Sequence, residues 1–195
     1  MKELKFYLCR HGESVFNVEN RLGGDSGLTG LGHAQAEALG DFLKDKYLDM
    51  IYVSNLKRTM QTAEIIKKYL SSAEFIVIPE LSEIRYGLLD GLTVSEAKGN
   101  FPEEYAKRVK DKYRSKPREG ESYADLLLRI KPFLNELCKK KGNYGIIGHK
   151  AVNKIILSQF SNLPLQEVLN MEFAHEHIFE ISYQSVREIS LEESI

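Results

Sequence analysis

Short apolar runs alternate along the chain with longer stretches in which apolar residues recur at helical spacing. The runs that we predict to be strands are residues 4–9, 49–54, 74–78 and 144–149. One predicted helix begins at a capping Thr29, and a second spans residues 55–70. A third runs from Ser122 to about Lys141, and a fourth spans residues 150–160. Strands that alternate with helices in this way form a mostly parallel sheet with helices on both faces. The sequence therefore predicts an α/β fold, a three-layer sandwich around a doubly wound sheet.

A long charged segment, residues 79–121, interrupts this alternation. It contains one stretch typical of a helix, "PEEYAKRVKDKY", and is too polar to form a core of its own. The chain has no internal repeat and no low-complexity linker. We therefore predict a single domain over residues 1–195, with residues 79–121 as a lid or rim.

The composition excludes several classes of protein. The 195 residues are 43% hydrophobic and carry a formal net charge of −1. Dedicated nucleic-acid and membrane-surface binders usually have more basic than acidic residues, so we expect neither kind of partner. The first apolar stretch is too short for a signal peptide and no later one would span a membrane, which favours a cytoplasmic protein. Cys9 and Cys138 lack metal-ligand spacing and are expected to be buried thiols, with a disulfide as the alternative.

Histidines stand at the ends of two predicted strands. His11 comes two residues after the first predicted strand, and His149 is the final residue of the last one. Because the carboxyl ends of parallel strands share one edge of a sheet, where ligands bind, we expect the two rings to face one pocket. Arg10, Arg58 and Glu83 lie near the ends of strands or at the start of the following helix. This combination of cations, imidazoles and one carboxylate favours an anion site.

The chemistry that fits these side chains is phosphoryl transfer to histidine. A neutral imidazole is a nucleophile near pH 7 if its other ring nitrogen donates to a carbonyl group. The guanidinium groups of Arg10 and Arg58 suit the equatorial oxygens of the transferring group. His149 could donate to a further oxygen in its protonated form. Glu83 is the candidate that protonates the leaving alcohol, because the negative charge of the phosphate favours a protonated carboxyl group.

The order of several motifs resembles the histidine phosphatase superfamily, in its phosphoglycerate mutase-like branch. The matching segments are "RHGES" at 10–14 followed by Asn17, "SGLTGLGHAQA" at 26–36, "VSNLKRTMQTA" at 53–63, "LSEIRYGLLDG" at 81–91, "GES" at 120–122 and "IIGH" at 146–149. The resemblance implies a phosphoglycerate mutase-like fold and a phosphohistidine intermediate on His11, with no metal and no cofactor. It also implies that Glu83 is the proton donor. The phosphate ligands that it implies are Arg10, Asn17, Arg58 and His149.

Departures from the family pattern concern the substrate. "GHK" follows the last strand, so Lys150 projects either into the pocket or away from it. We expect Lys150, Arg85 and His175 to add positive or switchable charge around the pocket, which would favour a substrate with a second anionic group. In "FAHEHIFEI", His175 and His177 would share one face of a strand. A metal site on this pair is the alternative to a pocket-edge histidine or an exposed one.

The sequence therefore predicts a metal-independent phosphatase that hydrolyses a small-molecule phosphomonoester. One alternative is a phosphoglycerate mutase, but the chain is shorter than typical mutases and lacks the tryptophan-containing stretch that they usually carry. Another is a non-catalytic phosphate-binding module, which the presence of both His11 and Glu83 disfavours. A homodimer is left open by the sequence.

Overall fold

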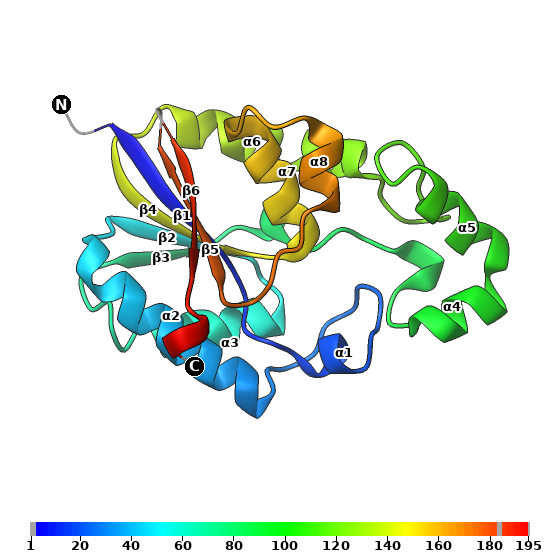
Figure 1. The fold of residues 1–195 in the computed structure, drawn as a ribbon, viewed down its shortest axis with the longest axis horizontal. Helices are drawn as coiled ribbons and strands as arrows, with labels where there is room; N and C mark the ends of the chain where they lie inside the picture. Colours follow the sequence, from blue (N-terminus) through cyan, green and yellow to red (C-terminus); the bar gives the residue numbers. More distant parts are fainter. Residues whose placement is uncertain (1–2, 183–184, 195) are drawn as a thin grey trace.

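The computed structural model describes residues 3–182 and 185–194, which form a six-stranded sheet with helices on both faces (Figure 1). The strands lie in the order β3-β2-β4-β1-β5-β6. Their bounds are β1 Leu4–Arg10, β2 Met50–Val53, β3 Glu74–Val77, β4 Gly142–Gly148, β5 His177–Ser182 and β6 Val186–Ser190. β1 to β4 pair in parallel, and β5 and β6 are antiparallel additions at one edge. The predicted α/β sandwich with a mostly parallel sheet is confirmed.

Each face of the sheet is covered by helices (Figure 1). The helices are α1 Val15–Val18, α2 Gly30–Leu43, α3 Lys57–Ile66, α4 Val94–Asn100, α5 Pro102–Lys110, α6 Tyr123–Cys138, α7 Lys150–Phe160 and α8 Leu165–Asn170. In β1, Phe6 and Leu8 pack on the side of α6 and α7, whereas Tyr7 and Cys9 pack on the side of α2 and α3. Because side chains alternate along a strand, a buried core forms on both sides of the sheet.

Two predicted capping residues are present, while the helix predicted over residues 55–70 is shorter, since α3 covers only Lys57–Ile66. Thr29 accepts a hydrogen bond from the amide of Gly32, and Ser122 forms a capping box with Asp125 at the start of α6. α7 has the predicted bounds, and α6 ends at Cys138, three residues before the predicted end. Cys138 is exposed there, so the expectation of a second buried thiol is wrong; Cys9 is buried, and both thiols are free.

The segment of residues 79–121 contains α4, α5 and the short 3₁₀ turns Pro79–Leu81 and Gly87–Leu89. In Figure 1 the green α4 and α5 extend away from the sheet, beyond the carboxyl ends of the parallel strands. The segment thus lies where it can border a ligand site. The division of the chain into one domain with a lid stays a prediction.

The register between β1 and β4 places the two histidines. Arg10 pairs with Gly148, so His11 and His149 each follow the last paired residue of neighbouring strands. The amide of His11 donates to the carbonyl oxygen of Gly148 at 3.2 Å. Beyond His11, a side chain at Gly12 would come within 2.2 Å of the Gly32 carbonyl oxygen, so the close approach of this loop to α2 requires glycine.

Candidate active site

His11 is held in one tautomer by its own backbone. Its Nδ1 lies 2.7 Å from the carbonyl oxygen of Gly12, and since a carbonyl only accepts, Nδ1 carries the proton and donates. The lone pair of the ring is therefore on Nε2, which accepts a hydrogen bond from Nε of Arg58 at 3.0 Å. The amide of Gly12 donates to Oγ1 of Thr62 at 3.1 Å, which holds the peptide that joins His11 to Gly12.

Arg58 lies in the first turn of α3, and its side chain reaches between the two histidines. Only 4% of the residue is exposed. Its Nε also donates to Nδ1 of His149 at 3.3 Å, while Nη1 donates to the carbonyl oxygen of Gly24 and lies 3.5 Å from Asp25. The guanidinium is thus a buried cation that contacts both imidazoles.

His149 caps the start of α7 and is fully buried. Because its Nδ1 accepts from Arg58, its Nε2 donates to Oγ of Ser54, at 2.8 Å. The ring centres of His149 and His11 are 5.1 Å apart. The two strand-end histidines therefore meet at one site.

Both rings are neutral in this environment. Burial, the neighbouring His149 and the charges of Arg10 and Arg58 lower the pKa of His11 well below its usual value. Burial and the charge of Arg58 do the same to the pKa of His149. Neutral His11 is the form that a nucleophile needs. The protonated His149 expected from the sequence, in contrast, requires a bound anion, whose charge would raise its pKa again.

Arg10 ends β1 and lines the same pocket. Its Nη1 donates to the carbonyl oxygen of Phe173 at 2.6 Å, while its Nε is buried without a hydrogen-bond partner among the described residues. Burial lowers the pKa of Arg10 only to about 10, so the group remains charged near pH 7. A half-buried cation with a buried, unsatisfied donor fits an anionic ligand.

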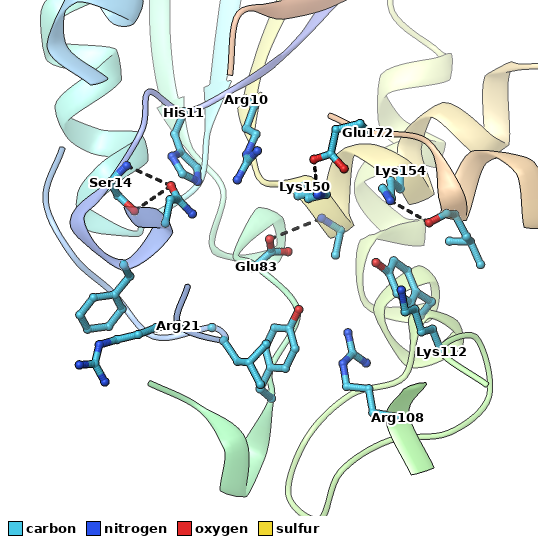
Figure 2. A pocket seen from close by; sticks show the side chains of 18 of the residues that line it. Arg10, His11, Ser14, Arg21, Glu83, Arg108, Lys112, Lys150, Lys154 and Glu172 are labelled. Carbon is cyan, nitrogen blue, oxygen red and sulfur yellow. Dashed lines mark hydrogen bonds and ion pairs between the residues drawn. The ribbon is translucent and has the colours of Figure 1, made fainter. Parts of the chain in front are cut away.

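Glu83 lies across the pocket from these cations (Figure 2). Its Oε1 accepts from the amide of Ile84 at 2.9 Å, and its Oε2 accepts from the amide of Ala151, in the first turn of α7, at 3.4 Å. The carboxyl group is thereby held at the same pocket as His11, where it can exchange a proton with a group bound between them.

Asn17 also lines the pocket, from α1. Its Oδ1 accepts from the amide and the hydroxyl of Ser14, at 3.0 and 2.9 Å, and so forms the capping box of this short helix. The same contacts fix the side-chain amide at the pocket wall. The structure thus brings Arg10, His11, Asn17, Arg58, Glu83 and His149 together at one edge of the sheet.

Two residues expected to add charge to the pocket are not part of its wall, although the ring centre of His175 lies 5.3 Å from that of His11. Arg85 does not line it; its side chain is 68% exposed and pairs with Glu121. His175 precedes β5, and its Nδ1 donates to the backbone carbonyl oxygen of His11 at 2.6 Å. Burial and the charge of Arg10 lower the pKa of His175 to about 3, so the ring is neutral near pH 7. Lys150 does line the pocket, where it pairs with Glu172.

The histidine pair considered for a metal is separated. His175 contacts the backbone of His11, whereas Nδ1 of His177, on β5, lies 2.6 Å from Oε1 of Glu188. Because His175 lies outside the strand, the two rings do not share a face. Within residues 3–182 and 185–194 there is no group of three or more His, Cys, Asp or Glu side chains that could hold a metal ion.

The sequence analysis missed a second group of cations. Arg108, Lys112 and Lys154 line the pocket of about 530 Å³ beyond Glu83, on the side away from His11 (Figure 2). Arg108 is buried above the rings of Tyr86 and Tyr123, 4.4 and 5.7 Å from their centres. The four-residue spacing of Arg108 and Lys112 was the available signal, but a charged helical stretch is more often a solvated surface.

The comparison with known families agrees with this geometry. The family model described as "Histidine phosphatase superfamily (branch 1)" matches residues 6–192. The chain belongs to the histidine phosphatase superfamily. Among described residues of this superfamily member, no helix is long and apolar enough to cross a membrane.

Curated relatives of this histidine phosphatase are longer proteins. It is 39% identical over 156 residues to 6-phosphofructo-2-kinase/fructose-2,6-bisphosphatase 1 of Mus musculus. The aligned residues make up 79% of the chain and 32% of the relative. It is 38% identical over 178 residues to the 6-phosphofructo-2-kinase/fructose-2,6-bisphosphatase of Arabidopsis thaliana. This alignment includes 89% of the chain and 23% of the relative. The chain thus spans about a third or less of the length of these relatives.

Solved structures share the fold of this histidine phosphatase over nearly its whole length. The α-ribazole phosphatase from Shigella flexneri has a TM-score of 0.86 at 21% identity, with 96% of each chain covered. Bacillus stearothermophilus YhfR has a TM-score of 0.80 at 27% identity, with 95% of each chain covered. The phosphoglycerate mutase-like fold implied by the sequence motifs is therefore confirmed.

The low pKa values of the buried histidines predict a loss of stability in acid. The unfolded chain binds protons near pH 6.5 that the folded chain does not, so the free energy of unfolding falls as the pH drops below about 6.5. Above that pH these histidines are neutral in both the folded and the unfolded chain, so they do not make the free energy of unfolding depend on pH. Each such histidine adds up to about 1.4 kcal/mol per pH unit.

We expect His175→Asn, which keeps a side-chain donor, to make the pH dependence of urea unfolding shallower by up to about 1.4 kcal/mol per unit between pH 6 and 4. The control His33→Gln, at an exposed position of α2, should retain the wild-type slope. Equal slopes for wild type and His175→Asn would contradict the assignment of a neutral, half-buried His175.

Proposed function

We propose that this histidine phosphatase hydrolyses phosphomonoesters through a phosphohistidine at Nε2 of His11. The observation that carries the proposal is the state of that atom. Nδ1 donates to the carbonyl oxygen of Gly12, and burial beside Arg10 and Arg58 keeps the ring neutral, so Nε2 holds a nucleophilic lone pair. The same cations surround the position that a phosphoryl group would take.

In the first step of the proposed reaction the phosphate oxygens replace Nε2 of His11 as acceptors for Arg58. Charged oxygens are stronger acceptors than an imidazole nitrogen, so binding frees the lone pair for attack. The Nε2–P bond forms as the bond from phosphorus to the alcohol oxygen breaks. That oxygen takes the proton of Glu83, so the alcohol leaves neutral.

In the second step a water molecule attacks the phosphorus atom. The carboxylate of Glu83, left by the first step, takes a proton from this water. The Nε2–P bond breaks, which releases inorganic phosphate and restores neutral His11. Side chains supply the nucleophile, the charge stabilisation and the proton transfer, so the reaction needs no metal.

We further propose that the substrate carries a second anionic group. Arg108, Lys112 and Lys154 line the part of the pocket beyond Glu83. Burial lowers the pKa of Lys154 to about 8, so most of it is still charged at pH 7. The relatives named fructose-2,6-bisphosphatase support this class, since that name describes a substrate with two phosphate groups.

The phosphohistidine is tested by trapping. With a ³²P-labelled phosphomonoester and chelator in excess, we expect an alkali-stable, acid-labile label on the wild-type protein. His11→Ala should lose the label and reduce turnover by roughly three or more powers of ten, because it removes the nucleophile. The exposed His33→Ala is the matched control and should keep both. Label that persists in His11→Ala would refute the proposal, as would activity that requires an added divalent ion.

Glu83→Gln should affect substrates according to their leaving groups. An alkoxide needs a proton to leave, whereas p-nitrophenolate does not, so only alkyl phosphates depend on a general acid in the first step. We expect first-turnover hydrolysis of 3-phosphoglycerate to fall by about 10² or more, and first-turnover release of p-nitrophenol by less than about tenfold. Equal losses would place the proton donor elsewhere.

The second anion is tested with a pair of alcohol phosphates. 3-Phosphoglycerate and glycerol 3-phosphate differ in a single carboxylate. A sheltered charge-assisted hydrogen bond contributes about 1.5–3 kcal/mol, so we expect kcat/KM to favour 3-phosphoglycerate by roughly one to two powers of ten. Lys112→Ala should narrow this ratio mainly through KM. Lys110→Ala, on the exposed surface of α5 and outside the pocket, should not. An unchanged ratio in Lys112→Ala would contradict the role of this lysine.

A further inference from the structure

A buried ion pair lies behind the segment that carries Glu83. Glu121 is the last residue of the rim segment and is 2% exposed. Arg129 projects from α6, and 19% of its side chain is exposed. Nε and Nη2 of Arg129 donate to the two carboxylate oxygens of Glu121, each at 2.8 Å. This two-point contact fixes the plane of the guanidinium group.

The remaining donors of Arg129 hold the backbone next to Glu83. Nη1 donates to the carbonyl oxygens of Glu80 and Ser82 at 2.6 and 3.0 Å, and Nη2 lies 3.4 Å from that of Glu83 itself. The carbonyl of Glu80 lies in the first of two short 3₁₀ turns, and those of Ser82 and Glu83 lie between the turns, where no α-helix or strand pairs the backbone. One guanidinium therefore supplies the partners that regular secondary structure would otherwise provide.

Glu121 holds the same segment from its other end. Its Oε2 accepts from the amide of Arg85 at 3.1 Å, and its own amide donates to the carbonyl oxygen of Arg85 at 2.8 Å. The ion pair thus brackets residues 80–85 on both sides of Glu83. The buried side chains of Leu81 and Ile84 anchor the segment to the core but do not fix its peptide planes.

The direction of the Glu83 carboxyl group depends on these peptide planes. One of its oxygens accepts from the next amide in the chain, that of Ile84, and the other reaches Ala151 at the long distance of 3.4 Å. A rotation of the 83–84 peptide would move the first of these contacts. We infer that the Arg129–Glu121 pair is a positioning device that aims Glu83 at the leaving oxygen, an inference that rests on the proposed function.

Lysine cannot reproduce these contacts. Arginine has five N–H donors in a rigid plane, and Arg129 uses them on one carboxylate and three carbonyls, whereas lysine offers three donors at a single point. Arg129→Lys therefore keeps the positive charge and the attraction to Glu121 while it releases part of the backbone. A purely structural role would lower every activity alike, but a role through Glu83 must depend on the leaving group.

The experiment compares first-turnover rates for 3-phosphoglycerate and p-nitrophenyl phosphate in the full chain. For Arg129→Lys we expect about a tenfold or greater loss on the alkyl substrate and a loss below about threefold in p-nitrophenol release. The matched control is Arg187→Lys, which makes the same change at an exposed arginine that pairs with Glu180 outside the pocket, and should preserve both rates. Added to Glu83→Gln, Arg129→Lys should cause little further loss on 3-phosphoglycerate, because the group through which it acts is gone.

Equal losses on the two substrates in folded Arg129→Lys would overturn the inference, as would additive losses in the double variant. If Arg129→Lys does not fold, Glu121→Gln carries the same test, because it retains one acceptor for Arg129 at nearly the same shape. A uniform loss in Glu121→Gln then also overturns the inference. A wild-type protein that hydrolyses neither substrate overturns the proposed function, and this inference with it. An active wild type with a leaving-group effect in Glu83→Gln alone overturns only the inference.

Discussion

The site depends on one buried positive charge placed between two imidazoles. Arg58 is almost wholly buried and donates to His11 and His149 through the same Nε. A protonated imidazole beside this guanidinium would place two like charges together at low dielectric, so the rings remain neutral and present lone pairs. His11, the proposed nucleophile, therefore needs no dedicated base. A phosphate dianion would balance the guanidinium charge and accept the same N–H groups.

The parallel sheet brings the residues of this site together through its strand order and register. β1 and β4 are neighbours in parallel register, so the residues that follow them emerge together, and α3 and α7 start at the same edge. The amide of Ala151, at the N-terminus of α7, meets Glu83, which comes from the connection after β3. Four chain segments far apart in sequence, those that follow β1, β2, β3 and β4, thus contribute to one pocket. Gly12 allows the first of them to lie against α2.

The sequence could predict the positions of residues that the order of strands and helices determines. His11, His149 and Arg58 are tied to strand ends or a helix start, and parallel strands bring such positions to one edge whatever the surrounding residues are. Side chains in irregular segments follow their local partners instead. Arg85 is drawn to Glu121 and away from the pocket, and His175 turns to the backbone of His11. Neither partner is visible from spacing, because both contacts join residues far apart in the chain.

The same reasoning explains why the second group of cations was missed. Arg108 looks like a solvated helix residue, yet the rings of Tyr86 and Tyr123 cover it and offset part of the cost of burying its charge. Its place in the pocket depends on how residues 79–121 fold against the start of α6, because Tyr86 and Tyr123 belong to these two parts of the chain. Among the described residues, only two carboxylates line the pocket, those of Glu83 and Glu172. Glu172 is paired with Lys150. An anion bound there therefore meets one unpaired carboxyl group, and its negative charge favours the protonated form of that group. In the proposed reaction, the charge that satisfies the arginines thus also makes Glu83 a proton donor, which links substrate binding to the first chemical step.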